Sequence, residues 1–347
     1  MNFYNSIHPY YCGIDLHART LYVCIIDQGG TTCLHKEIPA DPDKLLNIIE
    51  PYRDNIVIGV ECMHCWYWVA DVCEQQGIHF ILGHALYMKA IHGGKAKNDR
   101  IDSFKIANLI RGGNFPLAYV YPQAMRATRD LLRRRMKIVR HGADLKAHVV
   151  NTTSQYNLPP NKLNLKNISA REQLKSTFPD VSVQKNIDLD MVILDCYAKQ
   201  LSKVEWFIEQ QAKQHNPVHL HLLKSITGVG PILSLTIIYE IGDIHRFESV
   251  QKFASYARLV KCKAESAGKS YGTQGNKIGN AHLKWAFSEA AVLYLRGNDK
   301  AKRYLDKLQR RMSKAKALSA LAHKLGRCVY FMLKNETVFD EGKFLKG

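Results

Sequence analysis

Residues 11–30 read YCGIDLHARTLYVCIIDQGG, and this stretch decides the expected fold. It predicts two apolar strands followed by the Gly29-Gly30 turn, and the TCLHKEI that comes next predicts a third strand of the same meander. One residue does not suit an apolar strand, because Asp15 lies in the middle of the first one. A carboxylate is costly to bury without a partner, so we expect Asp15 to have one.

The segments that follow alternate between strand and helix patterns. NIVIGVE is a continuous apolar run, typical of a strand that is buried on both faces. The other expected elements are helices over 41–54, 64–77 and 100–113, a buried strand over 78–84 and an extended segment over 116–122. This order predicts an α/β domain with a mixed sheet, spanning residues 1–122.

The pattern changes after residue 122 to long, charged helices. Two of them are expected over 124–156 and 188–214, separated by a polar stretch over 157–186 with little periodicity. We interpret 123–218 as a helical, coiled-coil-like arm or linker. A third region, 219–347, is helical and punctuated by glycines. The expected fold class is therefore α/β plus all-α, in three domains.

Charge and cysteine content limit the function classes. The chain has 49 Lys and Arg against 31 Asp and Glu, a formal net charge of +18, which indicates a polyanionic partner such as nucleic acid. No apolar run reaches the roughly 18 to 20 residues of a membrane-spanning helix, and the start of the chain does not resemble a secretory signal.

Nine irregularly spaced cysteines favour reduced thiols and a cytoplasmic location. Cys62 and Cys65 have the spacing of a zinc pair but no second pair, so small buried side chains of a helix are the default interpretation.

Four acidic residues stand where strands and a helix would bring them together. Asp15 lies inside the first strand and Glu61 ends NIVIGVE. Asp99 and Asp102 are spaced i, i+3 near a helix start, which places both on one face. Singly, Asp99 would suit a helix N-terminus and Glu61 an exposed strand end. Together the four carboxylates would repel one another unless cations neutralised them, and oxygen ligands of this kind suit Mg²⁺ or Mn²⁺. We expect a divalent-metal site that performs phosphoryl transfer.

Residues 13–111 contain GIDLHARTLYVCIID, VIGVE and KAKNDRIDSFKIANLI. In these motifs the chain resembles the RuvC-like DEDD domain of the bridge-RNA-guided insertion-sequence transposases, family "one-ten" in the insertion-sequence nomenclature. The resemblance implies a ribonuclease-H-like fold in which Asp15, Glu61, Asp99 and Asp102 bind the metal. Members often carry Thr-Gly after the glutamate, whereas this chain reads ECMHCWYW.

The third region contains two motifs that suit contact with phosphate. LLKSITGVGPILSL has the pattern of a helix-hairpin-helix, whose glycine turn lets backbone N–H groups approach a phosphate, although a plain packing turn has the same pattern. KCKAESAGKSYGTQGNK predicts a flexible basic loop with two exposed serines, Ser266 and Ser270. Such a loop would hold phosphates through Lys269 and Lys277 or present a nucleophile, and composition leaves both open.

Residues 222–296 resemble the second domain of the same family. The markers are Gly-Val-Gly-Pro, EIGDIHRF, FASYARL, the serine loop and KIGNAHLKWA. In that family a serine of the loop attacks DNA and forms a covalent phosphoserine, and the best match here is Ser266, with Ser270 as a second candidate. The resemblance also implies a guide RNA, dimerisation through the arm, docking of the DEDD domain of one protomer on the serine domain of another, and a dimer of dimers.

The chain has two basic runs, over 126–146 and 300–327. A solvated helix face normally mixes acidic and basic residues, but these runs contain few acids, which favours contact with phosphate. The residues expected to bind nucleic acid in them are Arg126, Arg129, Arg133, Arg134, Lys137, Arg140, Arg303, Arg310 and Arg311. We therefore predict a DNA transposase or site-specific recombinase that uses Mg²⁺ or Mn²⁺ and Ser266. Two alternatives stay open: a metal-dependent nuclease of the Holliday-junction-resolvase type that uses water, and a non-catalytic nucleic-acid-binding protein.

Overall fold

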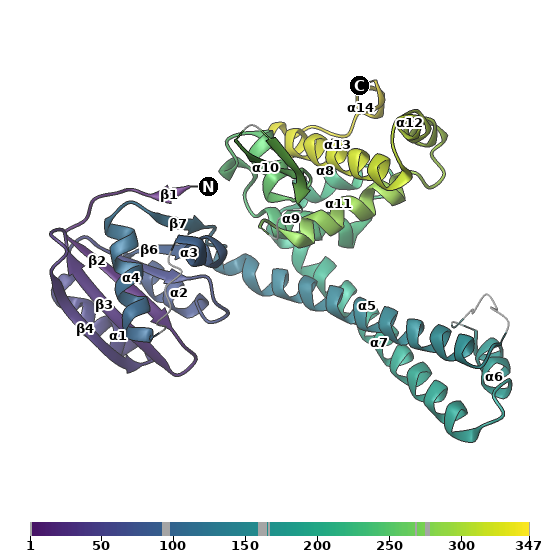
Figure 1. Ribbon diagram of the computed structural model, residues 1–347, viewed down its shortest axis with the longest axis horizontal. Coiled ribbons are helices and arrows are strands. Elements are labelled where there is room, and N and C mark those ends of the chain that lie inside the picture. Colours follow the sequence, from purple (N-terminus) through teal and green to yellow (C-terminus); the bar gives the residue numbers. More distant parts are fainter. Residues whose placement is uncertain are drawn as a thin grey trace. The chain divides into compact units, whose positions relative to one another are not determined.

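The computed structural model describes residues 2–91, 98–158, 165, 167–267, 269–274 and 278–346. The chain divides into two compact units, Met1–Gln123 and Ala124–Gly347 (Figure 1). No helix among the described residues is long and apolar enough to cross a membrane.

The first unit is built on a seven-stranded mixed sheet with the order β1-β7-β6-β5-β2-β3-β4. The strands are β1 (Phe3–Tyr4), β2 (Tyr10–Leu16), β3 (Thr20–Asp27), β4 (Thr32–Pro39), β5 (Ile56–Glu61), β6 (His79–Gly83) and β7 (Phe115–Ala118). The meander β2-β3-β4 is antiparallel, whereas β2, β5 and β6 run parallel to one another. The predicted mixed sheet is confirmed, and its strand order is that of a ribonuclease-H-like fold. The short β1 was not predicted.

Helices cover both faces of this sheet (Figure 1). On one face, α1 (Pro42–Ile49) and α2 (Tyr67–Gln75) pack on the even-numbered residues of β2, such as Ile14. On the other face, α4 (Asp99–Arg111) packs on odd-numbered residues such as Tyr11. The separation follows from the alternation of side chains along a strand. A short helix, α3 (Ala85–Ile91), was not predicted.

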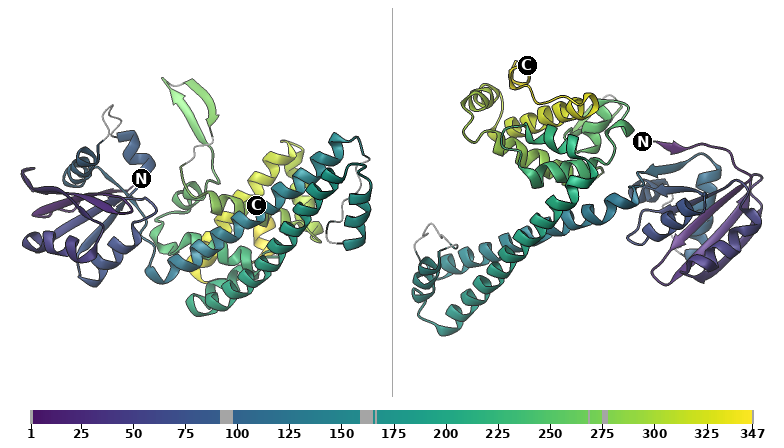
Figure 2. Two further views of the ribbon diagram at one scale, coloured as in Figure 1. Left: turned by 90° about the horizontal axis from the view of Figure 1, so that it is seen from below. Right: turned by 180° about the vertical axis from the view of Figure 1, so that it is seen from behind.

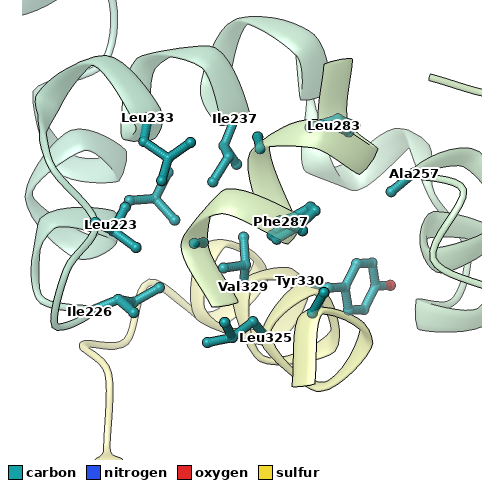
Figure 3. Close-up of a cluster of buried hydrophobic side chains, with 14 of the residues drawn as sticks. Leu223, Ile226, Leu233, Ile237, Ala257, Leu283, Phe287, Leu325, Val329 and Tyr330 are labelled. Carbon is teal, nitrogen blue, oxygen red and sulfur yellow. The ribbon is translucent and has the colours of Figure 1, made fainter. Parts of the chain in front are cut away.

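The second unit is helical except for one hairpin. Its helices are α5 (Gln123–Gln155), α6 (Ile168–Ser176), α7 (Val181–His215), α8 (Pro217–Lys224), α9 (Pro231–Ile241), α10 (Val250–Tyr256), α11 (Ala281–Tyr294), α12 (Asp299–Gln309), α13 (Lys314–Asn335) and α14 (Glu341–Leu345). In its core, Ile237 of α9, Phe287 of α11 and Val329 of α13 lie close together (Figure 3). The prediction of an α/β region followed by an all-α region is confirmed.

The long helices α5 and α7 lie side by side, and α6 lies next to the C-terminal end of α5 and the N-terminal end of α7 (Figure 2). An ion pair joins Arg135 to Glu205 at 2.6 Å, and the Nδ1 of His148 lies 2.6 Å from Oδ2 of Asp190. The polar stretch 157–186, which has little periodicity in sequence, contains α6 and the first turns of α7, so α7 begins earlier than the predicted helix over 188–214. Both helices begin at polar caps, in which the side chains of Asn167 and Asp180 accept backbone N–H bonds.

The Gly-Val-Gly turn between α8 and α9 packs against another helix. Gly228 has a φ of +82°, and a Cβ there would lie 2.6 Å from the backbone of Leu293 in α11. Gly230, in contrast, has open space where its side chain would be. Of the two interpretations of this motif, Gly228 therefore favours the packing turn.

Candidate active site

Two neighbouring parallel strands carry the first two acids. The register pairs Gly13 with Gly59 and Ile14 with Val60, so the next rung places Asp15 of β2 beside Glu61 at the end of β5. The Asp15 side chain is 18% exposed, and Glu61 is half-buried. Because paired residues of parallel strands point to the same face, both carboxylates lie at one edge of the same sheet face.

Glycines two residues before each strand acid let α4 approach this face closely. A Cβ on Gly13 would lie 2.3 Å from the backbone nitrogen of Ala107, and one on Gly59 would lie 2.5 Å from Cδ1 of Ile110. At Gly13 the near atoms are helix backbone, so only glycine fits there, whereas a Cβ at Gly59 would require the end of the Ile110 side chain to move. Since residues two apart on a strand share a face, α4 lies on the face that carries the acids.

The first turn of α4 is fixed by polar contacts. Asn98 caps the helix by accepting a hydrogen bond from the backbone N–H of Arg100. From β4, the Nε2 of His35 lies 2.9 Å from the carbonyl oxygen of Arg100 and 3.2 Å from the hydroxyl of Ser103. Burial lowers the pKa of His35, which keeps its ring neutral around pH 7. These contacts hold Asp99 and Asp102 in place beside the sheet.

The structure brings Asp15 and Asp99 together around a histidine. The Nε2 of His17 lies 3.5 Å from Oδ2 of Asp15 and 3.3 Å from Oδ2 of Asp99. Asp102 is 27% exposed and forms an ion pair with Lys105 at 3.3 Å. Sequence reasoning missed His17, although the alternation of strand residues would have placed it on the same face as Asp15.

The electrostatics of this cluster suit a cation. Burial raises the pKa of Asp15, and the negative charges of Asp99 and Asp102 raise it further, whereas His17 lowers it. Ligand atoms of Asp15, His17 and Asp99 all lie within 4.8 Å of one another, so this group is able to hold a metal ion. The charge of Asp102 raises the pKa of Asp15, and Glu61 lies beside Asp15 on the neighbouring strand. The residues present therefore fit a divalent metal.

The two cysteines after Glu61 do not have the predicted place. Cys62 is exposed and precedes α2, and Cys65 donates a hydrogen bond from its thiol to the carbonyl oxygen of Leu16. Neither is a buried side chain inside a helix, so that interpretation is wrong. Within the described ranges they form no cluster with other metal-ligating groups.

The serine segment of the second unit is a β-hairpin, so the prediction of a flexible loop is wrong. Strand β8 (Cys262–Ser266) pairs antiparallel with β9 (Lys269–Gln274). Ser266 is paired with Lys269, and Ser270 with Glu265. Both candidate serines are thus next to the turn of the hairpin, although their side chains lie outside the described part. Lys269 is exposed, and Lys277 lies outside the described residues.

A buried charge network, formed by Arg129, Arg133, Glu240 and Asn280, lies where the chain enters α11 after the hairpin. Glu240 of α9 is 1% exposed and accepts hydrogen bonds from Arg133 at 2.6 and 2.9 Å, from Arg129 at 3.2 Å and from Asn280 at 2.8 Å. Asn280 also caps α11, since its side chain accepts the N–H groups of His282 and Leu283. Burial alone would raise the pKa of Glu240, but the hydrogen bond from Arg133 and the charges of both arginines lower it.

This burial corrects part of the predicted nucleic-acid interface. Arg126 is 4% and Arg129 is 9% exposed, so their guanidinium groups do not reach a phosphate in solution. Arg133 is engaged with Glu240. The predicted residues with exposed side chains are Arg134, Lys137, Arg140, Lys269, Arg303, Arg310 and Arg311.

Transposase family models match parts of both units. A family model described as "Transposase IS116/IS110/IS902 family" matches residues 220–306, which include α9, the hairpin and α11. A DEDD-type model described as "Transposase" matches residues 12–157, which include all four acids.

Two curated proteins are similar to this chain, and both are transposases. A probable family 20 transposase of Pseudomonas aeruginosa is 21% identical over 297 residues, which cover 81% of this chain and 84% of that protein. The transposase for insertion sequence element IS1111A of Coxiella burnetii is 27% identical over 124 residues, or 35% of this chain and 34% of that protein. With an acidic cluster on a ribonuclease-H-like sheet and family matches in both units, this chain belongs to the IS110 family of DEDD transposases.

Proposed function

We propose that this transposase breaks and rejoins DNA phosphodiesters with a divalent-metal site at Asp15, Glu61, Asp99 and Asp102 and with Ser266 as the nucleophile. The observation that carries the proposal is the convergence of Asp15 and the first turn of α4 in a group that is able to hold a metal ion. We further propose Mg²⁺ or Mn²⁺ as that ion, because carboxylate oxygens suit both.

The proposed reaction is a phosphoryl transfer to serine. The hydroxyl oxygen of Ser266 forms a bond to the phosphorus of the DNA backbone while the bond to a deoxyribose oxygen breaks. The serine gives up its proton, and the displaced oxygen takes one. A bound divalent ion would stabilise the negative charge that develops on the oxygens in this step. Rejoining reverses the transfer, as a deoxyribose hydroxyl attacks the phosphoserine.

Partners and assembly belong to the same proposal. We propose that the exposed basic residues of α5 and of the α12–α13 region bind DNA and a guide RNA. We also propose three domains, 1–122, 123–218 and 219–347, with self-association through the arm. Exposed apolar side chains on α7 support this association, among them Leu189 at 55%, Val192 at 61% and Trp206 at 66% exposure. Large apolar side chains in water on a helix favour contact with a partner.

Trapping the covalent intermediate tests the proposed chemistry. Protein, element-end DNA, co-purified RNA and Mg²⁺ are incubated together, and peptides linked to DNA are identified by mass spectrometry. We expect a DNA-linked peptide in the wild type and in Ser270→Ala, and none in Ser266→Ala or Asp15→Asn. Each of these variants removes one function and leaves the strand or hairpin backbone in place.

Other outcomes of the trapping experiment identify the rivals. A resolvase-like nuclease would cut DNA without any adduct, and Ser266→Ala would cut as well as the wild type. A non-catalytic binding protein would show no cleavage, and Asp15→Asn would change nothing. Linkage at Ser270 would overturn the assignment of Ser266.

The salt dependence of DNA binding tests the exposed basic residues. We expect the double variant Arg310→Gln/Arg311→Gln to make the slope of log K against log salt shallower, by about 0.9 for each lost phosphate contact on duplex DNA. Fluorescence anisotropy over a salt series measures the slope. Lys343→Gln is the control, because Lys343 is 87% exposed but pairs with Asp340, and its slope should equal that of the wild type. An unchanged slope in the double variant would remove these arginines from the interface.

A further inference from the structure

We propose that His17 is a ligand of the divalent metal, so that the site is a mixed nitrogen and oxygen site that prefers Mn²⁺ to Mg²⁺. This inference rests on the proposed metal site and adds a residue outside the four acids. It predicts which ion the protein binds more tightly.

His17 lies where it would bind the same metal ion as two of the acids. Its Nε2 lies 3.3 Å from one Asp99 oxygen and 3.5 Å from one Asp15 oxygen. Ligands at about 2.1 Å from one octahedral ion lie about 3 Å apart when adjacent and about 4 Å apart when opposite. These two separations fall in this range, and all three atoms lie within 4.8 Å of one another, so one ion would reach them after side-chain shifts.

The turn between β2 and β3 does not require a histidine at position 17. It follows β2 directly, in the turn that leads to β3, and its side chain is 44% exposed. Its backbone N–H bonds to the carbonyl oxygen of Thr20, an interaction that any residue except proline makes. Within the described part of the chain, the recorded contacts of the ring are those with Asp15 and Asp99. A turn needs no imidazole, whereas a metal site beside two carboxylates uses one.

A nitrogen ligand changes which ions bind best. Imidazole suits transition metals, whereas Mg²⁺ prefers carboxylate, carbonyl and water oxygens. Mn²⁺ takes the same oxygen ligands as Mg²⁺. As a transition-metal ion it also binds imidazole, whereas Mg²⁺ gives up its water reluctantly, so His17 should favour Mn²⁺ over Mg²⁺. An all-oxygen site made by His17→Asp should shift the preference back toward Mg²⁺.

Pulsed electron paramagnetic resonance of bound Mn²⁺ tests the ligand directly. The full chain is loaded with Mn²⁺ without DNA, and electron spin-echo modulation detects ¹⁴N nuclei bound to the ion. We expect ¹⁴N modulation in the wild type that changes when the protein is labelled with [¹⁵N]histidine. It should disappear in His17→Asn and His17→Asp. The control His221→Asn changes an exposed histidine of α8 in the other unit and should keep the modulation.

Affinity provides the second readout. We expect His17→Asn to weaken Mn²⁺ binding at least tenfold, the lower bound seen when even outer partners of metal ligands are removed. His17→Asp should retain Mn²⁺ binding and bind Mg²⁺ more tightly than the wild type, as measured by competition against Mn²⁺. Since the residue lies in an exposed turn, both variants should keep the circular dichroism spectrum of the wild type.

The outcomes separate this inference from the proposed function. Mn²⁺ bound without nitrogen modulation would overturn the role of His17 and leave the acids and Ser266 untouched. Nitrogen modulation together with no DNA-serine adduct would support His17 and overturn the serine chemistry. No bound Mn²⁺ at all would overturn the ligand role and the metal site together.

Discussion

Glu240→Gln is expected to lower the free energy of unfolding of the second unit by about 3 to 5 kcal/mol, the usual cost of removing one partner from a buried ion pair. Glu240 is buried and is shared by the buried guanidinium group of Arg129 and the partly exposed one of Arg133, and it also binds Asn280. A neutral glutamine leaves the buried charge of Arg129 without a counter-charge and removes the partner of Arg133, whose side chain is 34% exposed. Urea denaturation followed by circular dichroism measures the change.

The matched control is Glu205→Gln. Glu205 of α7 pairs at 2.6 Å with Arg135, which lies on α5 like Arg129 and Arg133. The Glu205 side chain is 32% exposed and the Arg135 side chain is 18% exposed. A solvated pair contributes less than about 1 kcal/mol, so this variant should be close to the wild type. Equal losses in the two variants would show that burial does not determine the strength of the Glu240 network.

The pH dependence of Glu240→Gln has a fixed direction. The pKa of Glu240 in the folded protein lies below its ordinary value of 4.5. The stabilisation from its charge is therefore fully present above pH 4.5 and is lost as the pH falls through the folded pKa. The stability difference between the wild type and the variant should shrink in acid, and a difference that grew there would contradict the charge assignment.

Gly13→Ala is expected to displace α4 and so to impair both stability and metal binding. The new Cβ would lie 2.3 Å from the nitrogen of Ala107 and 2.4 Å from the carbonyl oxygen of Ser103, and a helix backbone cannot move aside as a side chain can. Overpacking of this kind costs about 1 to 3 kcal/mol. Because Asp99 lies on the helix that must move, the affinity for Mn²⁺ should fall as well. Thermal denaturation and Mn²⁺ titration measure the two effects.

Gly29→Ala serves as the control for Gly13→Ala. Gly29 lies in the turn between β3 and β4, where a Cβ would meet the ends of two side chains, Asp27 at 3.3 Å and Thr31 at 4.0 Å, and no backbone atom within 4 Å is among its three nearest neighbours. This variant should keep both the stability and the Mn²⁺ affinity of the wild type. A Gly13→Ala protein that bound Mn²⁺ normally would show that the close seat of α4 is not required for the site.

The sheet and the four acids were accessible from the sequence because their signals are local. Apolar runs predicted β2 and β5, and an i, i+3 spacing predicted that Asp99 and Asp102 share a helix face. The contacts of Arg129 were not accessible, because its partner Glu240 lies 111 residues away in the sequence. A basic helix face has the same pattern whether it meets phosphate or a buried carboxylate, and only tertiary structure separates the two cases.

The serine segment shows a second limit of local patterns. Its glycines and lysines indicated a loop, whereas pairing between β8 and β9 makes it a hairpin. His17 was missed for a different reason: the alternation of strand residues gives it the same face as Asp15, but only the fold places Asp99 beside it.

The close packing of α4 against Gly13 and Gly59 links each glycine to the acid that follows it. Gly13 precedes Asp15 by two residues, and Gly59 precedes Glu61 by two. Gly13 leaves room for the backbone of α4, the helix that carries the remaining acids, and Gly59 leaves room for the Ile110 side chain of the same helix, so each glycine couples the close packing of α4 to the acid two residues later. In a divergent sequence, we therefore expect the same close packing of a helix where two strands each carry glycine, any residue and an acid near their carboxyl ends.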